Sequence, residues 1–395
     1  MAVLAPPPES LRAGEPGPAG VDEGMRILAQ EGCIQCNKCT FSCPVHRADV
    51  AFSPRKVILQ AYLGGADDVS ERDLWACLTC GECQAVCPTQ VPYPAFIRAK
   101  REALRPVMER AAPCKHGGYK DILARIMAKP NLNQDRRAWI GDGLKVADTG
   151  DVIYFTGCMP YLDGVFTYCD SARIGKAAIK IMNAAGIVPI VANAERCCGH
   201  DALWNGDRET FETLARRNAE WIRASGARRL VTTCAECYSM LKYEYPKVVG
   251  EWPVEVLHMT ELIEELVKAG RLTFTKPVDL TVTYQDPCRL GRHSKEYDAP
   301  RAVLRAIPGV TFVEMDRVRE NAMCCGVGAY SNCDAQTKFL QQERLEEAAS
   351  KAGNLVTACP HCRIHFSCYL DGRPVDPLPD LKIVDVTDLA AQALG

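Results

Sequence analysis

Hydrophobic positions in the second half of the chain follow two different periods that alternate along the sequence. Short runs rich in β-branched residues, such as those over 152–155, 186–192 and 310–314, have the length and composition of buried strands. Longer segments, including 208–224 and 334–352, have the character of helices. Strands that alternate with helices indicate α/β units with largely parallel sheets, in which ligands collect at the carboxyl ends of the strands.

The remaining chain divides into three parts with other patterns. Residues 1–20 are rich in Pro, Gly and Ala and predict a flexible tail rather than a secretory signal. Residues 21–110 predict short helices, over 55–63, 71–75 and 93–108, around loops that contain cysteines. Residues 111–150 are polar and contain helix breakers such as Lys129-Pro130-Asn131, so they predict a linker.

Residues 151–275 and 276–395 read as two copies of one domain. Each copy opens with an apolar run that ends in cysteine, continues to a Cys-Cys-Gly sequence, and closes with an apolar run into Cys-x-x-Cys. The matched cysteines lie 130, 127 and 125 residues apart: Cys158 and Cys288, Cys197 and Cys324, Cys234 and Cys359. A duplicated domain is the simplest account of a register that drifts so little.

The chain has 22 cysteines in 395 residues, which is the abnormal feature of its composition. Its formal net charge of −2 argues against a nucleic-acid partner, and no apolar stretch approaches the length of a membrane span. Secreted disulfide scaffolds are short, whereas a long chain without a recognisable export signal is expected in a reducing compartment, where clustered thiolates bind metal.

Two cysteine runs near the N-terminus have the spacing of bacterial ferredoxins, in which the fourth cysteine of each run ligates the other cluster. Each run is followed by proline, which prevents the turn from continuing as a helix. Zinc also binds Cys-x-x-Cys pairs, but zinc sites rarely need a third and fourth cysteine at these offsets. The spacing therefore predicts two cubane [4Fe–4S] clusters, one on Cys33, Cys36, Cys39 and Cys87, the other on Cys77, Cys80, Cys83 and Cys43.

Each copy of the duplicated domain offers five cysteines, one more than a cubane or a tetrahedral metal needs. The glycine after each adjacent pair permits a positive φ or a close approach of the backbone. The predicted metal ligands in the two copies are Cys158, Cys197, Cys198, Cys234 and Cys237, then Cys288, Cys324, Cys325, Cys359 and Cys362.

With these motifs, the chain resembles the D-type iron–sulfur subunit of heterodisulfide reductase over roughly residues 25–390. Related proteins are the iron–sulfur subunits of glycolate oxidase and of anaerobic glycerol-3-phosphate dehydrogenase. The resemblance implies an all-helical ferredoxin-like domain followed by an α/β duplicated cysteine-rich domain. It also implies that each five-cysteine set holds a non-cubane [4Fe–4S] cluster, and that the two clusters cleave a disulfide by successive one-electron steps.

Cleavage of a disulfide produces two thiolates that must be protonated, so a proton donor near the clusters is expected. His200 follows Cys-Cys-Gly, His361 lies inside the second Cys-x-x-Cys, and His293 follows Cys288 by five residues. The alternative role for these three histidines is hydrogen bonding to cluster sulfur or backbone, which tunes the reduction potential. Arg289 and Arg292 are candidates to bind acidic groups of a substrate, but a solvated or salt-bridged face is the simpler account of each.

The leading functional hypothesis is a redox subunit, located in the cytoplasm and with any membrane contact made through a partner. Electrons would arrive from a membrane cytochrome b, a quinone-reactive subunit or a flavoprotein, and would reduce (or form) a disulfide of a small thiol cofactor or a protein. No Gly-x-Gly-x-x-Gly follows a predicted strand, so a partner would bind any flavin or nicotinamide.

Two alternatives remain open from the sequence. One is a non-catalytic electron-transfer subunit of a flavin-dependent 2-hydroxy acid or glycerol-3-phosphate dehydrogenase, delivering electrons to quinone. The other is a zinc-bound structural scaffold, which would contain no iron. All ten cysteines of the duplicated domain are present, which matches disulfide-cleaving members better than relays, where one copy is commonly degraded.

Overall fold

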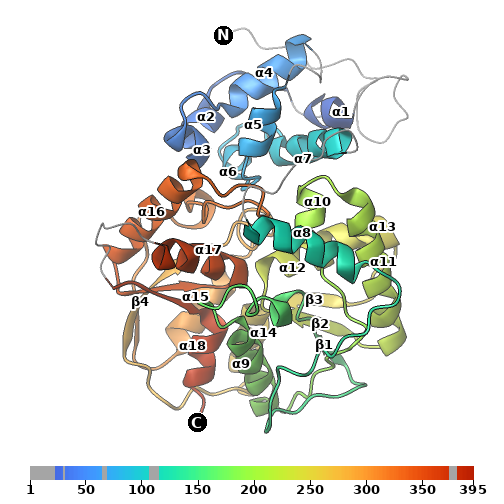
Figure 1. The fold of residues 1–395 in the computed structure, drawn as a ribbon. Helices are drawn as coiled ribbons and strands as arrows, with labels where there is room; N and C mark the ends of the chain where they lie inside the picture. Colours follow the sequence, from blue (N-terminus) through green and yellow to red (C-terminus); the bar gives the residue numbers. More distant parts are fainter. Residues whose placement is uncertain (1–22, 30–31, 65–68, 106–114, 373–379) are drawn as a thin grey trace. The chain divides into compact units, whose positions relative to one another are not determined.

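A computed structural model describes residues 23–29, 32–64, 69–105, 115–372 and 380–395 (Figure 1). The chain forms two compact units. The first contains the described residues up to Ile122 together with 201–208 and 326–340, and the second contains 123–200, 209–325 and 341–395. The predicted tail over 1–20 lies outside the described residues, and the division into a tail, three domains and a linker stays a prediction.

The N-terminal part of the first unit consists of short helices separated by cysteine loops. Proline opens two of these helices, and the Ser70 side chain caps α5 by accepting a hydrogen bond from the Asp73 N–H at 3.1 Å. The expected helices over 55–63 and 71–75 are confirmed, and α7 covers the described part of the one expected over 93–108. The helices are α1 (Glu23–Ala29), α2 (Lys38–Ser42), α3 (Pro44–Ala48), α4 (Pro54–Gly64), α5 (Glu71–Ala76), α6 (Glu82–Ala85) and α7 (Tyr93–Leu104).

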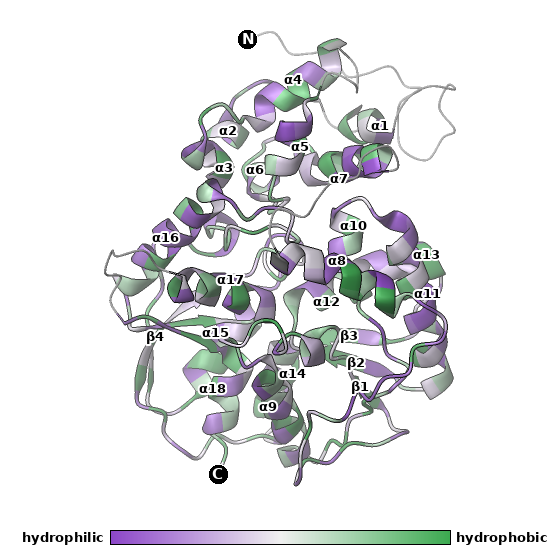
Figure 2. Ribbon diagram, in the orientation of Figure 1, coloured by the Kyte–Doolittle hydropathy of each residue, from purple (hydrophilic) through white to green (hydrophobic). Residues whose placement is uncertain are grey.

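Amphipathic helices build the small core of this unit. Leu28 of α1, Val57 and Ala61 of α4, and Phe96 and Ile97 of α7 are all fully buried. Figure 2 shows hydrophobic and hydrophilic residues mixed along α4 and α7, as expected for helices with one buried face.

The predicted linker over 111–150 contains a regular element, α8 (Lys115–Met127). The sequence prediction gave weight to the polar composition and the breakers after residue 128. It overlooked the apolar residues of the preceding segment, of which Leu123, Ala124 and Met127 are buried.

The second unit contains two parallel sheets, as the alternating pattern predicted. The first has the order β1-β2-β3 and the second has the order β5-β4-β6-β7. All pairings are parallel, with registers such as Ile153 opposite Leu230 and Tyr284 opposite Val356. The strands are β1 (Val152–Tyr154), β2 (Arg229–Thr232), β3 (Glu255–His258), β4 (Leu280–Gln285), β5 (Val310–Phe312), β6 (Asn354–Thr357) and β7 (Lys382–Asp385).

The two sheets repeat one topology, which agrees with the duplication inferred from the cysteines. Strands β1, β2 and β3 correspond in order to β4, β6 and β7. The strand predicted over 186–192 is reduced to isolated bridges, in which Ile190 pairs with Ile153 and Ala147 at the position that β5 occupies in the second copy.

Helices of one copy pack on helices of the other. Helix α9 (Ser171–Ala184) contacts α18 (Val386–Gln392), and α14 (Met259–Lys268) contacts α15 (Asp298–Ala306). Because α9 corresponds to α15 and α14 to α18, these are equivalent contacts exchanged between the copies. The copies therefore form a pseudosymmetric pair with one continuous core.

The other helices of the duplicated region follow the strands and cysteine loops. The helices expected over 208–224 and 334–352 are confirmed as α11 and α16. No helix among the described residues is long and apolar enough to cross a membrane. These remaining helices are α10 (His200–Trp204), α11 (Arg208–Ser225), α12 (Ala235–Ser239), α13 (Tyr245–Val249), α16 (Ala335–Ala349) and α17 (Pro360–Asp371), together with the shorter or irregular turns η4 (Met159–Tyr161), η5 (Met240–Glu244) and η6 (Arg319–Asn321).

Candidate functional site

Five cysteines from both N-terminal runs line one hollow of the first unit. Cys33, Cys36 and Cys39 come from the first run and Cys83 and Cys87 from the second, and they border a space of about 400 Å³. Cys36, Cys39 and Cys87 are half-buried, so this hollow lies close to the surface of the unit. Burial raises the pKa of the Cys39 thiol to about 11.

A second hollow is lined by Cys43 with Cys77, Cys80 and Cys83 and measures about 310 Å³. All four cysteines are buried, and desolvation holds the pKa of Cys43 and Cys83 well above its usual range. Iron cations would supply the positive charge that makes buried thiolates favourable, so this chemistry fits a cluster. Cys87 lines the first hollow and Cys43 lines the second, as an exchange of fourth cysteines requires, while Cys83 borders both hollows. The ligand assignment itself stays a prediction.

Arg101 of α7 fixes the loop at the start of the second cysteine run. Its guanidinium is fully buried and donates hydrogen bonds to the carbonyls of Leu74 (2.7 Å), Cys77 (2.6 Å) and Trp204 (3.0 Å). A buried charge held by several carbonyl groups is costly to disturb, which makes this loop rigid.

The cysteines of the duplicated region gather where parallel strands end, as the sequence predicted. Cys158, Cys234, Cys288 and Cys359 follow the carboxyl ends of β1, β2, β4 and β6 within four residues. Nine of the ten cysteines are buried, and Cys288 is partly exposed. The glycines after the paired cysteines, Gly199 and Gly326, have φ of +80° and +84°, which confirms the predicted need for glycine.

Within the first set, the thiols lie close enough to interact. Hydrogen bonds from Cys197 and Cys237 lower the pKa of Cys198 to about 6. The backbone also approaches closely, since a Cβ added at Gly157 would lie 2.7 Å from the Cys237 sulfur. Only glycine fits at that position.

The two five-cysteine sets meet at their Cys-x-x-Cys sequences. Cys234 of the first copy and Cys359 of the second influence each other: Cys359 helps burial to raise the pKa of Cys234, whereas Cys234 lowers the pKa of Cys359. Cys325 likewise raises the pKa of Cys362. Cysteines of both copies therefore interact at this junction.

Glu236 lies at this junction and connects two of the predicted histidines. Its Oε2 atom is 3.3 Å from Nδ1 of His200 and 3.3 Å from Nε2 of His361. The same His361 nitrogen is 3.7 Å from the sulfur of Cys158, so a histidine of the second copy contacts a cysteine of the first.

Arg289 connects the group of Glu236, His200 and His361 to the third predicted histidine, His293. It donates from Nε to Nε2 of His200 at 2.8 Å, and its Nη1 lies 2.8 Å from Nε2 of His293. Arg289 is 3% exposed, while His293 is only half-buried. His200 and His361 thus lie at the cysteine junction, whereas His293 reaches it only through Arg289.

Arg292 is the other predicted anion-binding arginine. It donates a hydrogen bond to the carbonyl of Ala322, two residues before Cys324, and so supports the loop that carries the Cys-Cys pair.

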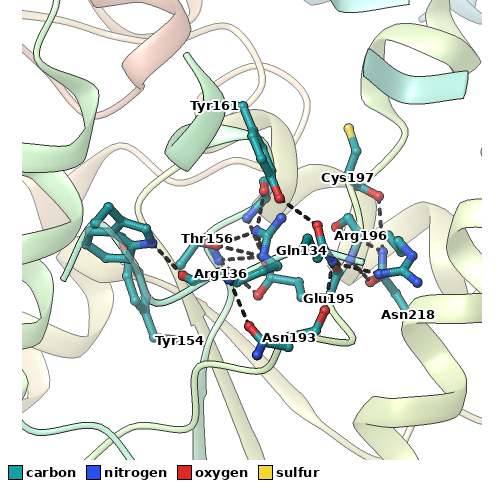
Figure 3. Close-up of polar contacts among 12 residues, drawn as sticks. Gln134, Arg136, Tyr154, Thr156, Tyr161, Asn193, Glu195, Arg196, Cys197 and Asn218 are labelled. Carbon is teal, nitrogen blue, oxygen red and sulfur yellow. Dashed lines mark hydrogen bonds and ion pairs between the residues drawn. The ribbon is translucent and has the colours of Figure 1, made fainter. Parts of the chain in front are cut away.

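A buried carboxylate ties two cysteine loops of the first copy together (Figure 3). Glu195 accepts hydrogen bonds from the Thr156 N–H (3.1 Å), the Thr156 hydroxyl (2.7 Å) and the Gly157 N–H (2.8 Å), and it pairs with the guanidinium of Arg136. Glu195 and Arg136 are both fully buried. Because Glu195 lies two residues before Cys197, this network fixes the Cys158 turn against the Cys-Cys turn.

Asn218 of α11 completes the support of that turn. Its amide oxygen accepts from the Arg196 N–H at 2.8 Å, and its amide nitrogen donates to the Cys197 carbonyl at 3.0 Å. In the second copy a neutral amide links the end of β4 to the segment before the Cys-Cys turn. Gln285 at the end of β4 donates to the carbonyl of Met323 at 2.9 Å and accepts from Arg344 at 2.5 Å.

Sequence reasoning missed Glu236, Glu195 and Arg136. A signal for Glu236 was present, because it occupies in Cys234-Ala235-Glu236-Cys237 the position that His361 occupies in Cys359-Pro360-His361-Cys362. Arg136 lies within the predicted linker, where a single arginine carries no signal.

The cysteines outside the predicted ligand sets are Cys114, Cys169, Cys333 and Cys368. Cys169 is fully buried, whereas Cys333 and Cys368 are half-buried, and Cys114 lies outside the described residues. None of the cysteines that the structure describes forms a disulfide.

Comparisons with known protein families find a ferredoxin-type region followed by two copies of a cysteine-rich domain. Residues 29–91 match a 4Fe-4S dicluster domain, and residues 152–242 and 282–367 each match the cysteine-rich CCG domain. The duplicated α/β region and the preceding ferredoxin-type helical region are therefore both shown.

Similar proteins extend over almost the whole chain. It is 32% identical to the D-type subunit of the dihydromethanophenazine:CoB–CoM heterodisulfide reductase of Methanosarcina acetivorans, covering 94% of this chain and 95% of that protein. It belongs to the family of D-type heterodisulfide reductase subunits. The family member of Methanosarcina barkeri is 31% identical over the same shares of both chains. A more distant relative is the "EtfAB:quinone oxidoreductase" of Syntrophomonas wolfei, 24% identical over 93% of this chain and 58% of that protein.

Membership of the heterodisulfide reductase family makes the chain an iron–sulfur electron-transfer subunit of an oxidoreductase. Its two cysteine-lined hollows and its cysteine junction are candidate places for such clusters in the described structure.

The first prediction concerns the exchange of fourth cysteines in the ferredoxin-like region of this heterodisulfide reductase family member. Cys87→Ser is expected to alter the same electron paramagnetic resonance signal as Cys36→Ser, because both side chains line one hollow. Cys43→Ser is the matched control and is expected to alter the signal that Cys80→Ser alters. If Cys87→Ser and Cys80→Ser affected one signal, the two groups would be wrong.

The second prediction concerns the buried carboxylate. Glu195→Ala would leave Arg136 charged and unpaired inside the protein, with a cost of about 3 to 5 kcal/mol in the free energy of unfolding. Glu212→Ala on the exposed side of α11 is the control and is expected to change stability by under about 0.5 kcal/mol. Anaerobic denaturant unfolding measures both variants, and equal stabilities would contradict a positioning role for Glu195.

Proposed function

We propose that this subunit passes electrons from two cubane [4Fe–4S] clusters to two non-cubane [4Fe–4S] clusters that reduce, or in reverse form, a disulfide. The observation that carries the proposal is the contact of the two copies at the cysteine junction, where Nε2 of His361 lies 3.7 Å from the Cys158 sulfur and 3.3 Å from Oε2 of Glu236. Through this contact the two intact five-cysteine sets form one centre, so that a single disulfide can lie within reach of both.

Under this proposal the cysteines divide into four ligand sets. The cubane clusters are held by the two groups that line the hollows of the first unit, and each non-cubane cluster is held by the five cysteines of one CCG copy. Bound there, each non-cubane cluster supplies one electron to the disulfide bond. The full set of proposed ligands is Cys33, Cys36, Cys39, Cys87, Cys43, Cys77, Cys80, Cys83, Cys158, Cys197, Cys198, Cys234, Cys237, Cys288, Cys324, Cys325, Cys359 and Cys362.

The protein's own side chains handle the protons of this reaction. Reduction of one disulfide takes up two electrons and two protons and yields two thiols. His361 lies 3.7 Å from the Cys158 sulfur, and Glu236 joins it to His200. We assign His361 and His200 to proton delivery at the centre, and His293, which contacts Arg289, to the outer end of the same path.

Arg289 suits a second role at this centre. It is a buried cation that already contacts two of these histidines, and its guanidinium is the chemistry that binds carboxylate or phosphate groups. A disulfide substrate with an acidic arm would place that arm beside Arg289.

The electron donor is a partner subunit, either a membrane cytochrome b or quinone-reactive subunit, or a flavoprotein. The names of the matched relatives include a subunit of a dihydromethanophenazine-dependent enzyme and an electron-transfer-flavoprotein:quinone oxidoreductase. In the proposed setting the chain works on the cytoplasmic side and meets the membrane only through that partner.

A second candidate function is a relay without disulfide chemistry. In this case the subunit would carry electrons between a flavin-dependent 2-hydroxy acid or glycerol-3-phosphate dehydrogenase and quinone. The match to the EtfAB:quinone oxidoreductase over 93% of this chain supports it.

The third prediction separates these candidates. The anaerobically reconstituted chain is expected to oxidise reduced viologen only when a disulfide is present, tested with the CoM–CoB heterodisulfide, oxidised glutathione and cystine. Cys359→Ser is expected to lower this rate by at least about 100-fold, because it removes a ligand at the junction, while the cubane signals persist. Absence of turnover with every disulfide at full iron loading would count against the proposal and favour the relay.

The fourth prediction concerns proton delivery. Glu236→Gln is expected to lower kcat for disulfide reduction by about 100-fold with little change in KM, and to enlarge the solvent isotope effect. Glu264→Gln, which removes a half-buried carboxylate of α14 that pairs with Lys268, is the matched control. An unchanged isotope effect in Glu236→Gln would leave Glu236 a purely structural residue.

A further inference from the structure

One face of the first unit combines exposed apolar side chains with a local excess of positive charge. Phe41 of α2 is 74% exposed, and Val50, just after α3, is 81% exposed. Lys38, Arg47 and Lys56 are exposed in the same stretch of chain. We call these five residues the α2–α4 face.

The charge of this region differs from that of the whole chain. Residues 32–64 contain four basic residues, Lys38, Arg47, Arg55 and Lys56, and one acidic residue, so the region carries a net charge of +3. That acidic residue, Asp49, is paired with Arg72. The complete chain carries −2, and the adjoining acidic residues Glu31, Asp67 and Asp68 lie outside the described residues, so the positive excess is that of the described stretch.

The α2–α4 face adjoins the two cysteine groups of the unit along the chain. Phe41 lies between Cys39, which lines one hollow, and Cys43, which lines the other. A hydrogen bond of 2.8 Å between the Thr40 and Ser53 hydroxyls joins α2 to the residue before α4, so the two ends of the stretch lie side by side.

This position matters because electron transfer falls steeply with distance. The group that contains Cys39 is also the more exposed of the two, since Cys36, Cys39 and Cys87 are half-buried and the other group is buried. A redox partner that covers Phe41 would therefore stand close to the more accessible group and near the second one.

We propose that the α2–α4 face is the docking surface for the electron donor, and that the donor presents an acidic rim around an apolar patch. Exposed aromatic residues are typical anchors of protein interfaces, and complementary charge speeds the encounter of redox partners. The inference rests on the proposed inflow of electrons at these two cysteine groups. It does not depend on disulfide chemistry at the second unit.

The test measures how fast a reduced acidic two-[4Fe–4S] ferredoxin reduces the reconstituted full chain in an anaerobic stopped-flow experiment. The second-order rate constant is expected to fall as salt rises from about 0.05 to 0.5 M. The double variant Phe41→Ser/Val50→Ser is expected to react about 10-fold more slowly. Lys38→Glu/Lys56→Glu is expected to react about 10-fold more slowly and with a weaker salt dependence.

Leu63→Ser is the matched control. Leu63 is also 74% exposed, but it lies near the opposite end of α4, roughly 14 Å along the helix axis from Pro54 at 1.5 Å per residue. It is expected to react within about twofold of the unaltered chain. Dithionite, a small reductant that needs no docking surface, is expected to reduce every variant at the same rate, and this shows that the clusters are intact.

Three results would overturn the proposal. In the first, the Phe41→Ser/Val50→Ser variant reacts with ferredoxin as fast as Leu63→Ser. In the second, ferredoxin fails to reduce a chain that dithionite reduces, or reduces it faster at high salt. In the third, the chain sediments with vesicles of anionic phospholipid in a Phe41-dependent manner, which would make the face a membrane contact. Viologen-driven disulfide turnover is measured separately, so failure of the docking surface and failure of the proposed function give different results.

Discussion

Mutual repulsion among buried thiolates is the constraint on which the rest of this protein depends. Cysteines of both copies interact at one junction in the second unit, where Cys234 and Cys359 shift each other's pKa. In a low-dielectric interior, several negative sulfurs at this spacing are unfavourable unless a cation lies between them. Iron–sulfur clusters supply that positive charge, so the fold and its cofactors are physically linked.

Duplication explains how one chain brings ten cysteines together, and it also explains why the centre is not symmetric. The copies exchange helix contacts, and matching strand ends deliver matching cysteines. The polar residues beside those cysteines differ, since Glu236 of the first copy is matched by His361 of the second. An acid facing a histidine across a pseudosymmetric junction gives the centre two unlike sides. A disulfide, whose two sulfurs leave as separate thiols, is a substrate for which unlike sides are useful.

The sequence carried most of the information about the elements that hold cysteines. Repeated spacing is a strong signal, and it predicted the duplication, the parallel sheets, the cysteines at strand ends and the glycines with positive φ. It failed where the decisive interaction joins residues far apart in the chain without any repeated spacing. Arg136 was assigned to a linker, yet it pairs inside the protein with Glu195, 59 residues later. The strand over 186–192 is reduced to bridges at Ile190, because apolar composition alone does not specify how much of a run finds a partner strand.

The buried polar groups also bear on whether the chain is a wire or a catalyst. A relay moves single electrons and needs no proton path, so in a relay the burial of Glu236, His200 and His361 beside the cysteine junction would serve only to tune the reduction potential. Their mutual contacts of 3.3 Å reduce the desolvation cost of that burial, but an apolar lining would avoid it. By contrast, the ion pair of Arg136 and Glu195 has a structural role, because Glu195 accepts a hydrogen bond from the Gly157 N–H. This bond holds together the turns that carry Cys158 and Cys197. The contacts that join Glu236 to His200 and His361, and His361 to Cys158, support the proposed reaction, because disulfide reduction consumes protons.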